Sequence, residues 1–204
     1  MMRLLSAPTS PFGRKVKIAA HMKGVMDLIK VEFVDTTDPQ KSVALQGENP
    51  LVKIPVLITK DGFQLFDSHV ICEYLDTLSS KGRLFPDAGP ARFNTLTLGA
   101  LGDGIMEAAL LQVYERRFRP EDKWVQSWID RQQAKVDSGI QHLEKNPPAF
   151  GATPDYGHVT IASALGYLDL RQDGRWRKTS PKLIAWLQRF ESVVPAFAAT
   201  APPK

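Results

Sequence analysis

The sequence predicts two domains of different class, an α/β domain with a mixed four-stranded sheet followed by an all-α helical bundle. Three observations predict this division. Short strand and helix signals alternate in residues 1–78, a segment rich in Gly, Pro and Ser covers 79–90, and only helical patterns occur in 91–204. A chain of 204 residues with 43% hydrophobic residues is large enough for two small domains with apolar cores.

The first domain is predicted to run β-α-β, then a linking segment, then β-β-α. Its elements are a strand over 3–5, a helix over 11–23 ending at Gly24, strands over 28–34, 55–59 and 63–66, and a helix over 68–78. The first two strands should be parallel, because a right-handed helical crossover joins them. The turn Lys60-Asp61-Gly62 favours an antiparallel hairpin for the next two strands. This order is thioredoxin-like.

Hydrophobic patterns support individual elements of both domains. Apolar and charged residues alternate over 28–34, as in a half-buried strand. In the helix over 68–78 the residues expected to face inward are Val70, Ile71, Tyr74, Leu75 and Leu78. In the second domain we expect helices over 91–114, 124–143, 159–170 and 181–194, separated where Pro147, Pro148 and Pro154 occur.

Composition excludes several classes of function. Cys72 is the single cysteine, so no intramolecular disulfide can form. The N-terminus has no sustained apolar stretch and no window reaches the ~20 apolar residues of a membrane span, so we expect neither a secretory signal nor a membrane protein, but a cytoplasmic one. The net charge of +4 comes without a recognisable reading element, so nucleic acid is not an expected partner. The four histidines have no metal-ligand spacing, and no metal is expected.

Five segments occur in the order found in one known family. They are TSPFGRKV (9–16), NPLVKIPVL (49–57), FDSHVICEYL (66–75), ALGYLDLR (164–171) and PKL (181–183) running into Trp186. In this order the segments resemble cytosolic glutathione transferases, and the resemblance covers nearly the whole chain. The closest similarity is to bacterial members that activate glutathione with serine or threonine, as in the theta and zeta classes. The beta class has a cysteine near the first helix, and this chain has none there.

Ser10 is the residue that the resemblance assigns to catalysis, with Thr9 as the alternative hydroxyl. Ser10 before Pro11 is also a good helix N-cap, and the two roles are compatible, since a hydroxyl accepts one hydrogen bond while it donates another. Lowering the pKa of a thiol from ~8.5 by about two units requires roughly 2.7 kcal/mol. One hydrogen bond to a charged acceptor supplies ~1.5–3 kcal/mol, and the helix dipole adds to it.

The resemblance also assigns residues to the glutathione tripeptide. A cis bond between Ile54 and Pro55 would let Ile54 offer its backbone N–H and C=O to the cysteinyl part. Lys53 would pair with the glycyl carboxylate, although it could equally be an ordinary solvated lysine. Ser68 would hold the γ-glutamyl carboxylate at a helix N-terminus, and Asp67 would face the γ-glutamyl amino group in place of the family's usual glutamate.

The second substrate is less well defined. Phe12, Met106 and Val113 are candidates for its pocket, whereas the stripe that contains Met106, Leu110 and Val113 is better explained as helix core. Cys72 is expected to serve packing rather than chemistry.

Relatives begin the helix that leads into segment 164–171 with Ser/Thr-x-x-Asp, a capping box. The present chain has Asp155 and His158 at these positions, so we expect Asp155 to cap and the reciprocal half to be lost or pH-sensitive.

The resemblance implies a homodimeric detoxification enzyme that conjugates glutathione, its co-substrate, to a small hydrophobic electrophile. Two alternatives remain open at this point. One is a glutathione-dependent isomerase, dehalogenase or reductase, of which the reductase is disfavoured because it usually needs a cysteine in place of Ser10. The other is a non-catalytic protein that binds glutathione or another ligand.

Overall fold

The computed structural model describes residues 1–203, without the side chains of residues 39–41. The chain forms two compact units, one of Met1–Arg92 together with the segment from Val194 onward, the other of Phe93–Val193. The first unit holds a four-stranded mixed sheet with helices and the second is helical, which confirms the predicted fold class.

The first unit contains all the strands of the described chain. In order its elements are β1 (Met2–Ser6), α1 (Pro11–Lys23), a 3₁₀ turn (Met26–Leu28), β2 (Ile29–Phe33), α2 (Pro39–Gln46), β3 (Val56–Ile58), β4 (Gln64–Leu65), α3 (Ser68–Thr77) and, at the C-terminal end, α8 (Ala196–Ala199). The strands lie in the order β2-β1-β3-β4. β1 is parallel to β2 and antiparallel to β3, and β3 is antiparallel to β4, as predicted.

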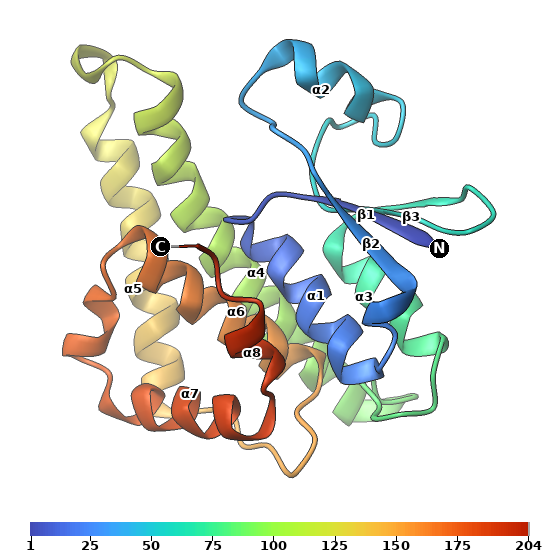
Figure 1. Cartoon of the computed structure of the whole chain (residues 1–204). Helices are drawn as coiled ribbons and strands as arrows, with labels where there is room; N and C mark the ends of the chain where they lie inside the picture. Colours follow the sequence, from blue (N-terminus) through green and yellow to red (C-terminus); the bar gives the residue numbers. More distant parts are fainter. Residues whose placement is uncertain (204) are drawn as a thin grey trace. The chain divides into compact units, whose positions relative to one another are not determined.

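The two faces of this sheet are covered by different helices. Figure 1 shows α1 and α3 on one face and α2 toward the other. Leu5 and Val56, which are paired in register, pack with Leu45 of α2. Leu4 and Leu57 are the next register pair, point to the opposite face because side chains alternate along a strand, and are fully buried.

Local signals placed α1 correctly. Ser10 caps its first turn, Pro11 begins it and Gly24 ends it with φ 68°, the left-handed conformation in which glycine has no steric penalty. The helix therefore begins and ends at the predicted residues.

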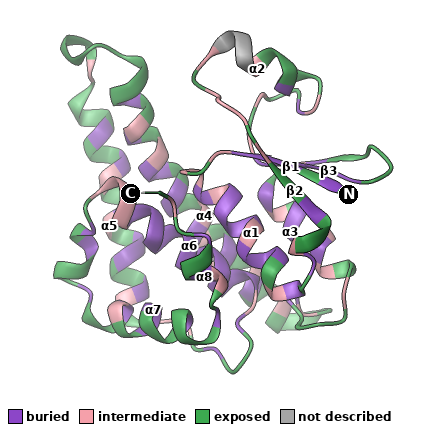
Figure 2. Ribbon diagram, in the orientation of Figure 1, coloured by how far each residue is buried: buried purple, intermediate pink, exposed green. Residues whose placement is uncertain are grey.

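Burial was predicted less well for β2 and α3. Only Ile29 of β2 is buried, whereas Val31 and Phe33 are 42% and 68% exposed, because β2 is the edge strand and has a neighbouring strand on one side only (Figure 2). In α3, Ile71 and Leu75 are buried as expected and Tyr74 is half-buried, but Val70 is exposed, as is Leu78 at the C-cap. The third buried apolar side chain of α3 is that of Cys72, which is consistent with a packing role.

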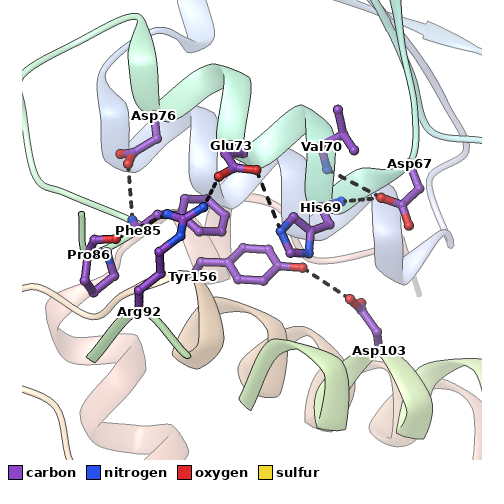
Figure 3. A network of polar contacts seen from close by, with 10 residues as sticks. All are labelled: Asp67, His69, Val70, Glu73, Asp76, Phe85, Pro86, Arg92, Asp103 and Tyr156. Carbon is purple, nitrogen blue, oxygen red and sulfur yellow. Dashed lines mark hydrogen bonds and ion pairs between the residues drawn. The ribbon is translucent and has the colours of Figure 1, made fainter. Parts of the chain in front are cut away.

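Residues 79–90, predicted as a linker, contain no helix or strand before α4 begins at Gly89. Hydrogen bonds and an ion pair connect this segment and α3 to α1. The buried Lys23 places Nζ 2.9 Å from Oδ1 of Asp76 and donates to the carbonyl of Gly82. Asp76 also accepts the backbone N–H groups of Leu84 and Phe85, at 2.9 and 3.2 Å. Figure 3 shows Asp76 and, one turn earlier on α3, Glu73, which pairs with Arg92.

The C-terminal end of the chain belongs to the first unit, a division that differs from the expected domain 91–204. Helix α8 packs on α1. The buried Arg14 donates to the carbonyl of Phe197 over 2.7 Å, and its guanidinium lies 4.0 Å from the centre of the Phe197 ring. The sequence did not predict this helix, because four residues carry no readable period.

The second unit consists of helices joined by short turns. They are α4 (Gly89–Phe118, entering the unit at Phe93), α5 (Gln126–Lys145), α6 (Tyr156–Arg171) and α7 (Pro181–Val193), with 3₁₀ turns at Glu121–Lys123 and Arg175–Lys178. α4 and α6 approach closely, since a Cβ on Gly157 would lie 2.8 Å from the carbonyl oxygen of Thr95. By length and apolar composition α4 would also suffice to cross a membrane, a test that core helices of soluble proteins pass as well.

The start of α6 excludes one of two alternatives expected from the sequence, namely that the reciprocal half of its capping box is lost. Asp155 Oδ1 accepts the backbone N–H of His158 at 3.1 Å, and the N–H of Asp155 lies 3.2 Å from Nδ1 of His158. Both halves of the capping box are therefore present, because an imidazole nitrogen takes the place of the usual carboxylate.

Candidate functional site

The candidate site lies at one end of the sheet in the first unit. β1 ends where β3 begins, since Leu5 pairs with Val56 in antiparallel register. β4 ends at the same place, because Leu65 pairs with Leu57 near the start of β3. The segments just beyond these strand ends therefore lie together at this end of the sheet. They contain Ser10 after β1, Ile54 and Pro55 before β3, and Asp67 and Ser68 after β4.

Ser10 occupies the N-cap of α1. Its backbone is extended, with φ −73° and ψ 118°, and its Oγ accepts the backbone N–H of Gly13 at 3.1 Å. Among the described residues no group accepts the hydrogen of this hydroxyl, so it remains available to a ligand. Positive charge from the helix dipole is centred on the same turn. The cap predicted from the sequence is confirmed.

Thr9 differs from Ser10 in one respect. It lies in the turn before the helix, where the N–H of Ser10 donates to the carbonyl of Ala7 at 3.0 Å, and its side chain makes no helix cap. Both residues are half-buried. Thr9 therefore lacks the hydrogen bond from the helix that holds Oγ of Ser10 in position.

Gly13 is a determinant of this site that the sequence alone did not reveal. A Cβ built at Gly13 would lie 1.9 Å from Oγ of Ser6, the last residue of β1. The first turn of α1 can thus rest directly on the end of the strand. We expect the position of the cap to depend on this contact, since a Cβ at Gly13 would overlap Ser6 unless the Ser6 side chain or the turn moved.

The loop before β3 is organised by Asn49, a second determinant that the sequence predictions did not single out. Its side chain is buried, accepts the N–H of Leu51 at 2.9 Å and donates to the carbonyl of Lys53 at 2.9 Å. These bonds fix the chain on the approach to Ile54. Its pattern Asn-Pro-Leu offers a turn signal that could have identified it.

Residues 53–55 follow from this loop. The Ile54–Pro55 peptide bond is cis, as the resemblance implied. Ile54 is half-buried, and neither its backbone N–H nor its C=O forms a hydrogen bond with any described residue. Buried backbone N–H and C=O groups are usually hydrogen-bonded. The N–H and C=O of Ile54 are therefore suited to bind an extended peptide ligand, as one β-strand binds its neighbour. Lys53 is exposed.

Asp67 and Ser68 form the start of α3. Asp67 is the N-cap, and its Oδ1 accepts the N–H groups of His69 and Val70 at 3.0 and 3.4 Å (Figure 3). Ser68 is the first helical residue and is buried. The structure therefore gives Asp67 a capping role in addition to the ligand role that the resemblance implies, and its Oδ2 faces no donor among the described residues.

Phe12 lies in the first turn of α1, next to the cap. It is half-buried, and Nζ of Lys15 lies 5.9 Å from the centre of its ring.

Two other predicted pocket residues belong to the helical unit. Met106 is fully buried, which favours the core interpretation of its stripe, and Val113 is half-buried. Within residues 1–203 no group of three or more His, Cys, Asp or Glu side chains is arranged to hold a metal ion.

Two domain profiles of one protein family match this chain. Residues 4–83 match the profile of the glutathione S-transferase N-terminal domain, and residues 126–189 match that of the C-terminal domain. The chain belongs to the glutathione S-transferase family. The glutathione S-transferase-like protein YibF of Escherichia coli K12 is 31% identical over 207 residues and both chains are fully covered.

Solved structures of other family members resemble the whole glutathione S-transferase chain described above. A member from Pseudomonas fluorescens Pf-5 with bound glutathione is 36% identical with a TM-score of 0.92, and both chains are fully covered. A glutathione S-transferase from Methylobacillus flagellatus KT with glutathione bound is 33% identical, again with full coverage of both chains and a TM-score of 0.90.

Proposed function

We propose that this protein is a glutathione transferase of the serine type, in which the Ser10 hydroxyl stabilises the thiolate of bound glutathione for attack on a hydrophobic electrophile. The observation that carries the proposal is the Ser10 cap. Its Oγ is held by the N–H of Gly13, and its hydrogen has no acceptor among the described residues. Thr9 is the alternative donor, one residue away.

The energetics of this role are sufficient. Only the thiolate attacks, and a free thiol titrates near ~8.5, so a bound thiol with a pKa about two units lower needs roughly 2.7 kcal/mol of preference for the anion. A hydrogen bond from the Ser10 hydroxyl to a charged sulfur supplies ~1.5–3 kcal/mol. The N-terminus of α1 adds ~0.3–1 kcal/mol. Positioning and thiolate stabilisation then account for the reaction.

The tripeptide would bind across the end of the sheet described above. Ile54 would pair its unsatisfied N–H and C=O with the cysteinyl backbone, next to Pro55. Ser68 would bind the γ-glutamyl carboxylate with its hydroxyl and N–H, Asp67 would bind the amino group through Oδ2, and Lys53 would pair with the glycyl carboxylate. The two solved relatives named above were crystallised with glutathione, which supports glutathione as the co-substrate.

Phe12 and Val113 are the remaining candidates for contact with the electrophile, while burial favours a core role for Met106. We further propose a cytoplasmic homodimer that serves detoxification, similar to the theta and zeta classes. Equilibrium sedimentation tests the dimer, which a mass near 22.7 kDa would refute.

A glutathione-consumption screen over halides, epoxides, isothiocyanates and peroxides tests the proposal. We expect turnover of at least one class of electrophile, loss of that turnover in Ser10→Ala, and little loss in Thr9→Val. Full activity in Ser10→Ala with loss in Thr9→Val would transfer the role to Thr9. Tight glutathione binding without turnover of any electrophile would identify a non-catalytic binder instead. Turnover confined to reduction, isomerisation or dehalogenation would replace conjugation as the reaction.

A further inference from the structure

The first turn of α1 contacts the rest of the first unit through two adjacent residues. Gly13 lies against the end of β1, where a Cβ on it would be 1.9 Å from Oγ of Ser6. Arg14 is the next residue, and its guanidinium contacts α8, which packs beside α1 (Figure 1). Successive side chains of a helix point about 100° apart, so the two contacts restrain the turn from different sides.

The contact with α8 is made by one buried pair, Arg14 and Phe197. Nη2 of Arg14 donates to the carbonyl of Phe197 over 2.7 Å, and the guanidinium carbon lies 4.0 Å from the centre of the Phe197 ring. Only 6% of Arg14 and 5% of Phe197 is exposed. A hydrogen bond from a charged donor and a cation–π contact are both stronger when they are shielded from water. This pair therefore connects the two helices more firmly than an exposed contact would.

The stability of α1 does not by itself explain an arginine at position 14. The first turn of α1 contains no acidic residue, and a cation near a helix N-terminus is repelled by the helix dipole. Burial of the guanidinium adds a desolvation cost. An apolar side chain of similar length would fill the same space without either cost. Another requirement, such as the placement of the turn, is therefore a better explanation of Arg14.

Both restrained residues form hydrogen bonds with Ser10. The N–H of Gly13 donates to its Oγ at 3.1 Å, and the N–H of Arg14 donates to its carbonyl oxygen at 3.0 Å. The place of the Ser10 hydroxyl thus depends on where the backbone of residues 13 and 14 lies. Hydrogen bonds weaken steeply as their angle departs from linear, so a shift of this turn would weaken the bond that the hydroxyl offers a ligand.

We propose that Arg14 is a positioning residue for Ser10, and that α8 holds it in place through Phe197. The C-terminal end of the chain thereby sets the strength of the hydrogen bond from Ser10 to the glutathione thiolate. Arg14 acts through the first turn of α1 and not by contact with the sulfur. The thiolate part of this inference rests on the proposed function, whereas the restraint on the turn does not.

Amide hydrogen exchange of Gly13, measured without glutathione, tests the restraint. Arg14→Met removes both contacts with Phe197 and keeps a side chain of similar length. It should accelerate this exchange roughly five-fold or more relative to the amides of α3, which report the stability of the unit. Phe197→Leu keeps the carbonyl and loses only the ring, so its effect should be smaller. Arg14→Lys can still donate to the carbonyl and should recover part of the protection.

The pKa of the bound glutathione thiol tests the effect on the site. We expect Arg14→Met to raise this pKa by about one unit, half of the two-unit shift proposed for the wild type. In the Ser10→Ala background the same substitution should leave the pKa unchanged, because the hydroxyl through which Arg14 acts is absent. A rise of equal size in both backgrounds would show a direct effect of the charge on the sulfur and would overturn the positioning role.

Arg189→Met is the matched control. Arg189 makes the same two contacts with Phe150 in the helical unit, since its Nη2 donates to the Phe150 carbonyl over 2.7 Å and its guanidinium lies 4.6 Å from the ring centre. Its substitution should leave both the exchange of Gly13 and the pKa of the bound thiol unchanged. Equal effects of Arg189→Met and Arg14→Met would show a general loss of stability and would overturn the inference.

The two readouts separate this inference from the proposed function. A lowered thiol pKa in the wild type that does not change in Arg14→Met contradicts the positioning role and leaves the proposed function standing. Unchanged exchange of Gly13 in both Arg14→Met and Phe197→Leu contradicts the restraint itself. A wild-type pKa near ~8.5 contradicts the proposed function, and faster exchange in Arg14→Met would then leave only the restraint standing.

Discussion

The backbone N–H of Gly13 donates to Oγ of Ser10 over 3.1 Å, so the oxygen of this hydroxyl caps helix α1 while its hydrogen has no acceptor among the described residues. Gly13 itself is pressed against Ser6, where a Cβ would meet Oγ at 1.9 Å. The capping role and the proposed catalytic role of Ser10 thus use different parts of the same group. Substitution can separate them.

Ser10→Asp should keep the cap and abolish the thiolate interaction. Aspartate caps as well as serine does, but its carboxylate donates nothing and repels a thiolate. We expect a free energy of unfolding within about 0.5 kcal/mol of the wild type and turnover reduced about 100-fold, which corresponds to ~2.7 kcal/mol. Ser10→Ala should lose both the cap and the thiolate interaction, and its free energy of unfolding should fall by ~1 kcal/mol. Urea unfolding and steady-state kinetics provide the two measurements. Wild-type turnover in Ser10→Asp would contradict the donor role.

Gly13→Ala should destabilise the first unit by about 1–3 kcal/mol, because the added methyl group overlaps Ser6. Ser6→Ala in the same chain removes the overlapping oxygen and should recover much of this loss. A double-mutant cycle measured by urea unfolding gives the coupling. Additive effects of the two substitutions would show that this contact does not position the helix.

Asn49→Ala should destabilise the protein by about 1–3 kcal/mol and raise the KM for glutathione. It leaves the N–H of Leu51 and the carbonyl of Lys53 without their partner, so the loop before Pro55 loses its fixed shape. Asn94→Ala, at an exposed position on α4, is the control and should alter neither quantity by much. An unchanged KM in Asn49→Ala would separate the loop from glutathione binding.

The capping box of α6 predicts a specific dependence of stability on acid. Burial would raise the pKa of Asp155, but hydrogen bonds from His158 and Thr95 outweigh it, and the pKa is lowered. A lowered carboxyl pKa contributes stability above the unfolded value, near ~3.9, and this stability is lost as the pH falls through the folded value.

Asp155→Asn is the matched control for this dependence, because asparagine caps equally well and does not titrate. The difference in free energy of unfolding between wild type and Asp155→Asn should shrink as the pH falls below ~4, where the carboxyl of Asp155 is protonated. Urea unfolding across pH 3–7 measures it. A difference that stays constant or grows in acid would contradict the assignment.

The sequence predicted those features whose causes are local. Ser10, Pro11 and Gly24 mark the two ends of α1 by chemistry confined to a few residues, and the bounds agree with the structure. The helix α2 over Pro39–Gln46 was missed, because it carries no marked apolar stripe and was read as a linking segment.

Features that depend on tertiary neighbours could not be read from the pattern. Val31 and Phe33 look like core residues of a strand, but β2 lies at the edge of the sheet. The contact of Arg14 with Phe197 joins residues at opposite ends of the chain. In the candidate site the ligand-binding residues were predicted by resemblance, whereas the close approach of Gly13 to Ser6 emerged only from distances in the folded chain.

The central claim is that Ser10 stabilises the glutathione thiolate, and its most direct test is the pKa of the bound thiol. Thiolate absorbance in the ultraviolet, followed through a pH titration of the binary complex, measures it for the wild type, Ser10→Ala and Thr9→Val. The account predicts a pKa of about 6.5 in the wild type and in Thr9→Val, and a return toward ~8.5 in Ser10→Ala. A wild-type pKa near ~8.5, or a value in Ser10→Ala that equals the wild type's, would contradict it.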